Sequence, residues 1–195
     1  FIMALSTRPL HSKFGKIVTD VNLDEVNENY LYQEIRELFE KHSALLFCDQ
    51  TFLEETHIKF AQLFGPLENR DAMATKKNIK FEIPKVSNED GEGSVFEESD
   101  LKTLDLKGNM LWHTDSTFLP IPALANIIAA KVIPSSGGQT ELASTRVALR
   151  DLPIGIYKKI EGRKIWHSDS ITYAQLCVHP CTCSTNNKHL PSSGL

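Results

Sequence analysis

The sequence predicts a mostly β fold with flanking helices. Compact apolar runs of strand length lie at residues 14–19, 44–48 and 124–133. Between residues 31 and 41, leucine, isoleucine and phenylalanine recur at helical spacing, so an amphipathic helix separates the first two runs. Strands on both sides of helices suggest a double-stranded β-helix, the jelly-roll architecture, although periodicity alone does not fix that choice.

A second helix is expected shortly after the apolar run at 44–48. Thr51 and Glu54 have the spacing of a capping box, which satisfies backbone N–H groups at the start of a helix. Gly65-Pro66 is expected to end that helix. We expect His57, which lies within it, to be a packed or surface histidine rather than a metal ligand.

The segment beyond residue 133 combines a turn with short helices. Pro-Ser-Ser-Gly-Gly at 134–138 predicts a turn that leads into 139–142. Apolar residues from Arg146 onward predict a short helix that proline breaks and restarts at Pro153, with Ile160 on the continuing apolar face.

Composition sets the class of protein. With 195 residues, 41% hydrophobic and 24% charged, the chain is long enough for one domain with a sizeable core. Its 21 basic and 25 acidic residues give a net charge of -4, and no Lys/Arg stripe with aromatics appears, so we do not expect nucleic acid as a partner. The longest apolar stretch, 119–134, contains three prolines, which argues against a membrane span. We expect a cytoplasmic protein whose natural start is Met3 or lies upstream.

A His-x-Asp pair is the main candidate for chemistry. Residues 109–118 read as a strand, in which His113 and Asp115 project to the same side. One imidazole and one carboxylate, joined by a second His from elsewhere, form the facial triad of non-haem Fe(II) oxygenases. With seven His and 25 acidic residues in the chain, the pair can also arise by chance or serve a structural role.

Motifs around this pair resemble a known enzyme family. They include Leu111-Trp-His-Thr-Asp-Ser-Thr-Phe118, Val132-Ile-Pro-Ser-Ser-Gly-Gly-Gln-Thr-Glu-Leu142, His42-Ser-Ala-Leu-Leu-Phe47 with Asp49-Gln50, and Leu63-Phe-Gly-Pro-Leu-Glu68. In this order they are similar to the taurine/2,4-dichlorophenoxyacetate dioxygenase (TauD/TfdA) family of Fe(II)- and 2-oxoglutarate-dependent enzymes, and the herbicide-degrading branch is the closer likeness. The match covers roughly residues 9–167 and is specific in combination.

The resemblance implies a jelly roll, Fe(II) as the metal, 2-oxoglutarate as co-substrate, and hydroxylation of a small organic acid, aryloxyacetate- or sulfonate-like, with O2. It implies that His113 and Asp115 are iron ligands, that Thr140 donates to the 2-oxoglutarate carboxylate, and that Asn109 lines the substrate side. Simpler roles stay open, because Thr140 suits a strand by its shape and Asn109 suits a turn. Trp112 is expected to pack in the core.

Residues 69–108 match the family poorly. Within them, 88–100 hold six acidic residues and no basic one. We expect a mobile insert, solvated in the simpler reading and a lid over the metal site in the other.

The site implied by the resemblance is incomplete within this sequence. The family's second His and its carboxylate-clamping Arg lie on late strands, further downstream than the 195 − 113 = 82 positions that follow His113. Arg163 comes too early to be that Arg, and the histidines beyond His113 come too early to be that ligand: His167, His179 and His189.

We expect a partial dioxygenase domain over residues 1–176 and an unrelated tail over 177–195, which has neither periodicity nor acids. A zinc site in the tail is the alternative; its ligands would be Cys177, Cys181 and Cys183 with His179 or His189.

Three readings follow. The first is a dioxygenase of which this chain holds half the site, the second is a non-catalytic or inactive product on the same scaffold, and the third is a metal-binding module built on the cysteine tail. The primary substrate is not readable from the sequence, and a homo-oligomer stays open.

Overall fold

The computed structural model describes residues 5–51, 53–69, 80–117 and 119–165. The described residues fall into two compact units. The first contains the described residues up to Pro84 and those from Ile121 to Ile165, and the second contains those from Lys85 to Pro120. The predictions for the 177–195 tail and for His167 lie outside the described residues. No helix in the described part of the chain is long and apolar enough to cross a membrane. A cytoplasmic location and a homo-oligomeric state stay predictions.

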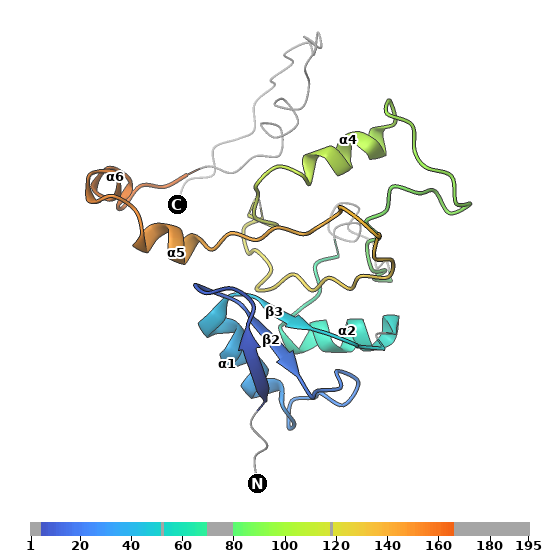
Figure 1. The fold of residues 1–195 in the computed structure, drawn as a ribbon, viewed down its shortest axis with the longest axis horizontal. Helices are drawn as coiled ribbons and strands as arrows, with labels where there is room; N and C mark the ends of the chain where they lie inside the picture. Colours follow the sequence, from blue (N-terminus) through green and yellow to red (C-terminus); the bar gives the residue numbers. More distant parts are fainter. Residues whose placement is uncertain (1–4, 52, 70–79, 118, 166–195) are drawn as a thin grey trace. The chain divides into compact units, whose positions relative to one another are not determined.

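The first unit is built on a three-stranded sheet in the order β1-β2-β3, drawn in blue and cyan in Figure 1. Strand β1 (Ser6–Pro9) is antiparallel to β2 (Lys16–Thr19), and β2 is parallel to β3 (Leu45–Phe47). A parallel pair needs a crossover, which helix α1 (Tyr32–His42) supplies. The structure confirms the predicted strands at 14–19 and 44–48 and the predicted helix between them. Strand β1 is exposed and was not predicted, because its sequence contains no apolar run.

The core of this unit lies where α1 meets α2 (Glu54–Leu63) and the loop after β2. Ile35 of α1 is 0% exposed and packs in one cluster with Leu23, Val26 and Phe60. Phe60 makes edge-to-face contacts with Phe47 of β3 and with Phe64, at ring centroid distances of 6.0 and 5.5 Å. The apolar face predicted from helical spacing therefore fixes the two helices against the sheet.

Helix α2 differs from its predicted start. It begins at Glu54, with Leu53 as the N-cap and no side-chain cap, so Thr51 lies too far ahead of the first turn and the capping box is wrong. The predicted end is confirmed, because Phe64 closes the helix and Gly65 follows with φ of 136°. His57 is 8% exposed, which confirms a packed histidine.

The later part of the first unit contains the two predicted short helices. Helix α5 (Thr145–Arg150) has Ser144 as its N-cap, whose hydroxyl oxygen accepts from the Val147 amide. Helix α6 (Ile154–Ile160) begins directly after Pro153. The run at 124–133 belongs to no strand among the described residues. The strand prediction for 124–133 is therefore wrong for this structure, since a strand is defined by a partner as well as by its own apolar pattern.

The second unit contains the acidic segment. Asn88 accepts a backbone hydrogen bond from Phe96, and the Asp90 carboxylate accepts from the amides of Glu92 and Ser94, both at 2.9 Å. These hydrogen bonds hold the pKa of Asp90 below its usual value. Helix α4 (Leu101–Gly108) follows, which sequence reasoning missed. Mobility or lid function of this insert stays a prediction.

Candidate metal centre

The backbone around the His-x-Asp pair is a helix end followed by turns. After α4, the amides of Met110 and Leu111 donate to the carbonyls of Lys107 and Gly108, both at 3.1 Å. Ser116 is buried and adopts a left-handed φ of 62°. The strand predicted over 109–118 is wrong for the described residues of that range, because nothing in the described part of the chain pairs with them to form a ladder.

His113 and Asp115 nevertheless converge. Nε2 of His113 lies 3.3 Å from Oδ1 of Asp115, and the two side chains are 40% and 47% exposed. The predicted meeting of the pair is confirmed, although a turn rather than strand alternation brings it about. Both groups are reachable from solvent, as a site that takes up a metal ion requires.

The hydrogen bond of Nδ1 of His113 determines how its other ring nitrogen, Nε2, is oriented. Nδ1 lies 2.6 Å from the carbonyl oxygen of Leu111. A carbonyl oxygen only accepts, so Nδ1 carries a proton, and Nε2 faces the Asp115 carboxylate, where it can act as an N–H donor or as a metal ligand. Metal-binding histidines commonly have this arrangement, in which the outer nitrogen donates to a carbonyl. Two acceptors at this distance repel each other unless a proton or a metal cation lies with them.

Sequence reasoning missed the part played by Leu111. Its contribution is a backbone carbonyl, which every residue possesses, so no side-chain pattern could have identified it. The only available signal was its position two residues before the histidine.

The donor set fits Fe(II) in type but is short by one ligand. An imidazole and a carboxylate are two of the three protein ligands of a non-haem Fe(II) site. Among the described residues, no group of three or more His, Cys, Asp or Glu side chains could hold a metal ion. Among the described residues, His113 and Asp115 thus offer two of the three side chains that such a site needs.

The other residues proposed from the sequence have different settings. Asn109 is exposed in the turn after α4. Trp112 is 69% exposed, so its predicted core packing is wrong; the turn offers it no sheet to pack against. Thr140 belongs to the first unit and is exposed. The roles of Asn109 toward substrate and of Thr140 toward 2-oxoglutarate stay predictions.

The turn before Thr140 forms as predicted. Gly137 and Gly138 both adopt left-handed φ values, 73° and 67°. A Cβ on Gly138 would lie 3.0 Å from the ring of Pro134, so both the left-handed conformation and the tight contact favour glycine there.

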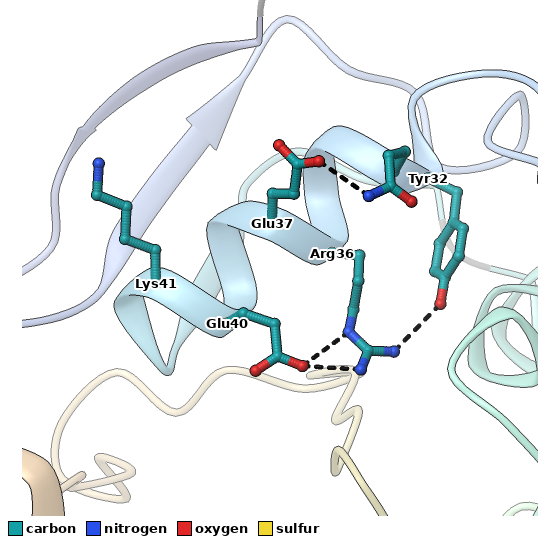
Figure 2. Close-up of a pocket in the computed structure, with 6 residues that line it drawn as sticks. Tyr32, Arg36, Glu37, Glu40 and Lys41 are labelled. Atoms are coloured by element: carbon teal, nitrogen blue, oxygen red, sulfur yellow. Dashed lines mark hydrogen bonds and ion pairs between the residues drawn. The ribbon is translucent and has the colours of Figure 1, made fainter.

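A hollow of about 600 Å³ along α1 is a different kind of feature. Figure 2 shows Arg36 between Glu40, which accepts from Nε at 2.9 Å and from Nη2 at 2.7 Å, and the Tyr32 hydroxyl. These hydrogen bonds raise the pKa of Arg36. All six residues that line the hollow come from α1, and the Arg36 guanidinium is already hydrogen-bonded to side chains of the same helix. The hollow is therefore a helix surface rather than a ligand site.

With this geometry established, comparison with known proteins identifies the family. The chain belongs to the family described as taurine catabolism dioxygenase TauD, TfdA family, whose pattern matches residues 6–191. Enzymes of this family depend on Fe(II) and 2-oxoglutarate.

Two enzymes illustrate the similarity in sequence. The chain is 35% identical over 167 residues to the (S)-phenoxypropionate/alpha-ketoglutarate-dioxygenase of Sphingobium herbicidovorans, which covers 85% of this chain and 54% of that protein. It is 32% identical over 168 residues to the alpha-ketoglutarate-dependent 2,4-dichlorophenoxyacetate dioxygenase of Cupriavidus pinatubonensis, covering 85% and 58%.

A solved structure is similar in fold. The crystal structure of AAD-2 in complex with Mn(II) and N-oxalylglycine superposes with a TM-score of 0.66 at 28% identity, over 82% of this chain and 54% of that one. The chain thus spans little more than half the length of the relatives that it matches.

Proposed function

We propose that this chain contributes one half of the active site of a dioxygenase that depends on Fe(II) and 2-oxoglutarate. The convergence of Nε2 of His113 and Oδ1 of Asp115, with the histidine tautomer set by the Leu111 carbonyl, carries the proposal. Membership of the TauD/TfdA family supports it, since that family uses this metal and this co-substrate.

In this function His113 and Asp115 would hold the iron. The bound iron and 2-oxoglutarate supply the oxidising power for hydroxylating a substrate C–H bond with O2, while 2-oxoglutarate is converted to succinate and CO2. The part of this chain is to present a preorganised imidazole and carboxylate. Thr140 would orient 2-oxoglutarate by donating its hydroxyl to a carboxylate, and Asn109 would line the substrate side.

The jelly roll is part of this proposal. Similarity to AAD-2 at a TM-score of 0.66 supports it. The described residues contribute one three-stranded sheet with helices, so the remaining strands of a double-stranded β-helix would come from elsewhere in such a domain. We keep 1–176 as the partial domain and 177–195 as a tail of separate origin, although the family match includes part of that tail.

An aryloxyalkanoic acid is the substrate class that we propose. The two enzymes compared above are named for phenoxypropionate and 2,4-dichlorophenoxyacetate, each a carboxylate linked through an ether oxygen to an aromatic ring. A sulfonate-like acid is the alternative within the same chemistry. Measuring succinate formation with a phenoxyacetate and with an alkylsulfonate would separate them in a protein that holds the complete site.

Thr140→Val tests the co-substrate role. Valine keeps the shape and removes the hydroxyl, so 2-oxoglutarate affinity should fall by about 1 to 2 kcal/mol, the scale of one hydrogen bond to a charged group. Fe(II) affinity should stay unchanged. Calorimetric titration with 2-oxoglutarate in the presence of Fe(II) measures the first affinity, and a separate anaerobic titration with Fe(II) measures the second. Thr117→Val is the matched control, and equal 2-oxoglutarate affinity in wild type and Thr140→Val would remove Thr140 from the site.

The alternative function is a non-catalytic or inactive product on the same scaffold. One observation favours it: the described residues offer no third ligand beside His113 and Asp115. We therefore expect the 195-residue chain alone to convert no 2-oxoglutarate to succinate above background, since each missing ligand or clamp costs about 10-fold to 100-fold. Robust turnover by the purified chain would show that a histidine outside the described residues completes the triad.

A further inference from the structure

Ser116, which directly follows Asp115, has an uncommon backbone conformation. Its φ of 62° lies in the left-handed region, where Cβ crowds the following carbonyl oxygen. Glycine, asparagine and aspartate adopt this conformation more readily than serine does. A serine keeps it only where the surrounding structure determines it, and residues of this kind gather at functional sites. The strained backbone thus lies directly beside a proposed metal ligand.

Ser116 is anchored on its C-terminal side. The residue is 4% exposed, and its carbonyl oxygen accepts from the amide of Leu119 at 2.9 Å, which closes a turn. Rotation about the N–Cα bond of Ser116 therefore decides where the preceding peptide group and Asp115 lie. A change from the observed φ to a right-handed value of about −60° is a rotation of about 120°, and it would swing Asp115 away from its present place.

His113 is anchored on the other side of the pair. The amides of Met110 and Leu111 donate to carbonyls at the end of α4, and the Leu111 carbonyl oxygen holds Nδ1 of His113 at 2.6 Å. The helix end thus places His113, and the turn at Ser116 places Asp115. The distance of 3.3 Å between Nε2 and Oδ1 depends on both anchors. All of these residues belong to the second unit, so the arrangement is local.

We propose that Ser116 is a positioning residue of the metal site, whose left-handed conformation sets the Asp115 carboxylate against Nε2 of His113 before a metal ion binds. It acts through the backbone of Asp115 rather than as a ligand. A divalent cation then meets two groups that are already together, so less conformational freedom is lost on binding. The metal part of this inference rests on the proposed function, whereas the positioning of the pair belongs to the metal-free chain.

Two substitutions at Ser116 separate the backbone conformation from the hydroxyl group. Ser116→Thr keeps the hydroxyl but adds a β-branch, which disfavours a left-handed φ. Ser116→Gly removes the hydroxyl and adopts this φ without strain. In calorimetric titration with Mn(II) as the probe, affinity should fall about 5-fold to 10-fold in Ser116→Thr and stay within about 2-fold of wild type in Ser116→Gly. Weak binding by Ser116→Gly, or wild-type binding by a folded Ser116→Thr, would overturn the proposal.

Nuclear magnetic resonance of the metal-free 195-residue chain supplies a readout that does not involve metal. A nuclear Overhauser contact between the His113 ring and the β-protons of Asp115 should be present in wild type and in Ser116→Gly and be lost in Ser116→Thr. A strong contact between the amide and α protons of Ser116 reports its positive φ, and a wild-type chain without it would contradict the proposal. These wild-type and Ser116→Gly spectra decide the question even where Ser116→Thr does not fold.

Ser43→Thr is the matched control. Ser43 is a second serine with a left-handed φ, 67°, and it ends α1 in the first unit. The same β-branch there should lower the melting temperature but leave the Mn(II) affinity and the contact between His113 and Asp115 unchanged. Equal weakening of Mn(II) binding by Ser43→Thr and Ser116→Thr would assign the loss to general instability and would overturn the positioning role.

Positioning and metal binding are read separately in this design. A contact between His113 and Asp115 that depends on Ser116, in a chain that binds no Mn(II), would retain the positioning role and count against the proposed function. Mn(II) binding that requires His113 and Asp115 but is equal in wild type and in folded Ser116→Thr would do the reverse.

Discussion

Replacing either His113 or Asp115 with alanine is expected to reduce Fe(II) affinity markedly. Each change deletes one of the two ligands that we propose among the described residues, so a loss of at least about 10-fold to 100-fold is expected, the range that the loss of an outer-shell partner already costs. Anaerobic titration calorimetry with Fe(II) measures it. Asp115→Asn should behave as Asp115→Ala does, since an amide keeps the shape but lacks the charge.

Two matched variants control for general effects of these changes. His11→Ala removes an exposed imidazole whose ring is tilted against that of Phe14, at a centroid distance of 5.7 Å. Asp100→Asn keeps an oxygen that can accept from the Glu97 amide, as the Asp100 carboxylate does at 2.8 Å. Both should bind Fe(II) as the wild type does. If the His113 and Asp115 variants also bind it normally, the pair is not the metal site.

Ile35→Ala should be the most destabilising single truncation in the first unit. Ile35 is 0% exposed and lies in the centre of the cluster with Leu23, Val26 and Phe60. Truncating a fully buried isoleucine removes apolar contacts and leaves a cavity, which costs about 2 to 5 kcal/mol of unfolding free energy. Urea unfolding followed by circular dichroism gives the difference.

Glu37→Ala on the exposed side of the same helix is the control. Its carboxylate accepts a hydrogen bond from the side-chain amide of Gln33, one helical turn away, at 2.8 Å. We expect the unfolding free energy to change by no more than about 0.5 kcal/mol. A loss for Ile35→Ala no larger than for Glu37→Ala would mean that the core of the first unit lies elsewhere.

The helices were predictable where local spacing or proline determines them. The apolar spacing at 31–41 and the break at Pro153 depend on neighbouring residues, and α1, α5 and α6 follow these signals. Helix α4 was missed because the acidic run before it was interpreted as continuous with a mobile insert. The capping box failed because the spacing of Thr51 and Glu54 does not specify at which residue the helix begins.

The strands were less predictable because each depends on a partner. The runs at 14–19 and 44–48 contain strands that pair with each other in the sheet. The apolar run at 124–133 and the segment at 109–118 also have strand-like sequences, but they form no ladder among the described residues. The contact between His113 and Asp115 was predicted correctly although the strand was not, since residues two apart can meet in a turn as well as on one side of a strand. The tautomer was not predictable, because it depends on the Leu111 carbonyl.

The most direct test of the central claim is to locate the metal on the chain by nuclear magnetic resonance. Mn(II), which occupies AAD-2, broadens resonances of groups close to it. Titration of the 195-residue chain under anaerobic conditions should broaden the imidazole signals of His113 and the amide of Asp115 first, with His11 and His57 unaffected. Broadening that begins instead at the acidic residues 88–100 or in the 177–195 tail, and leaves His113 sharp, would contradict the assignment of a metal site to His113 and Asp115.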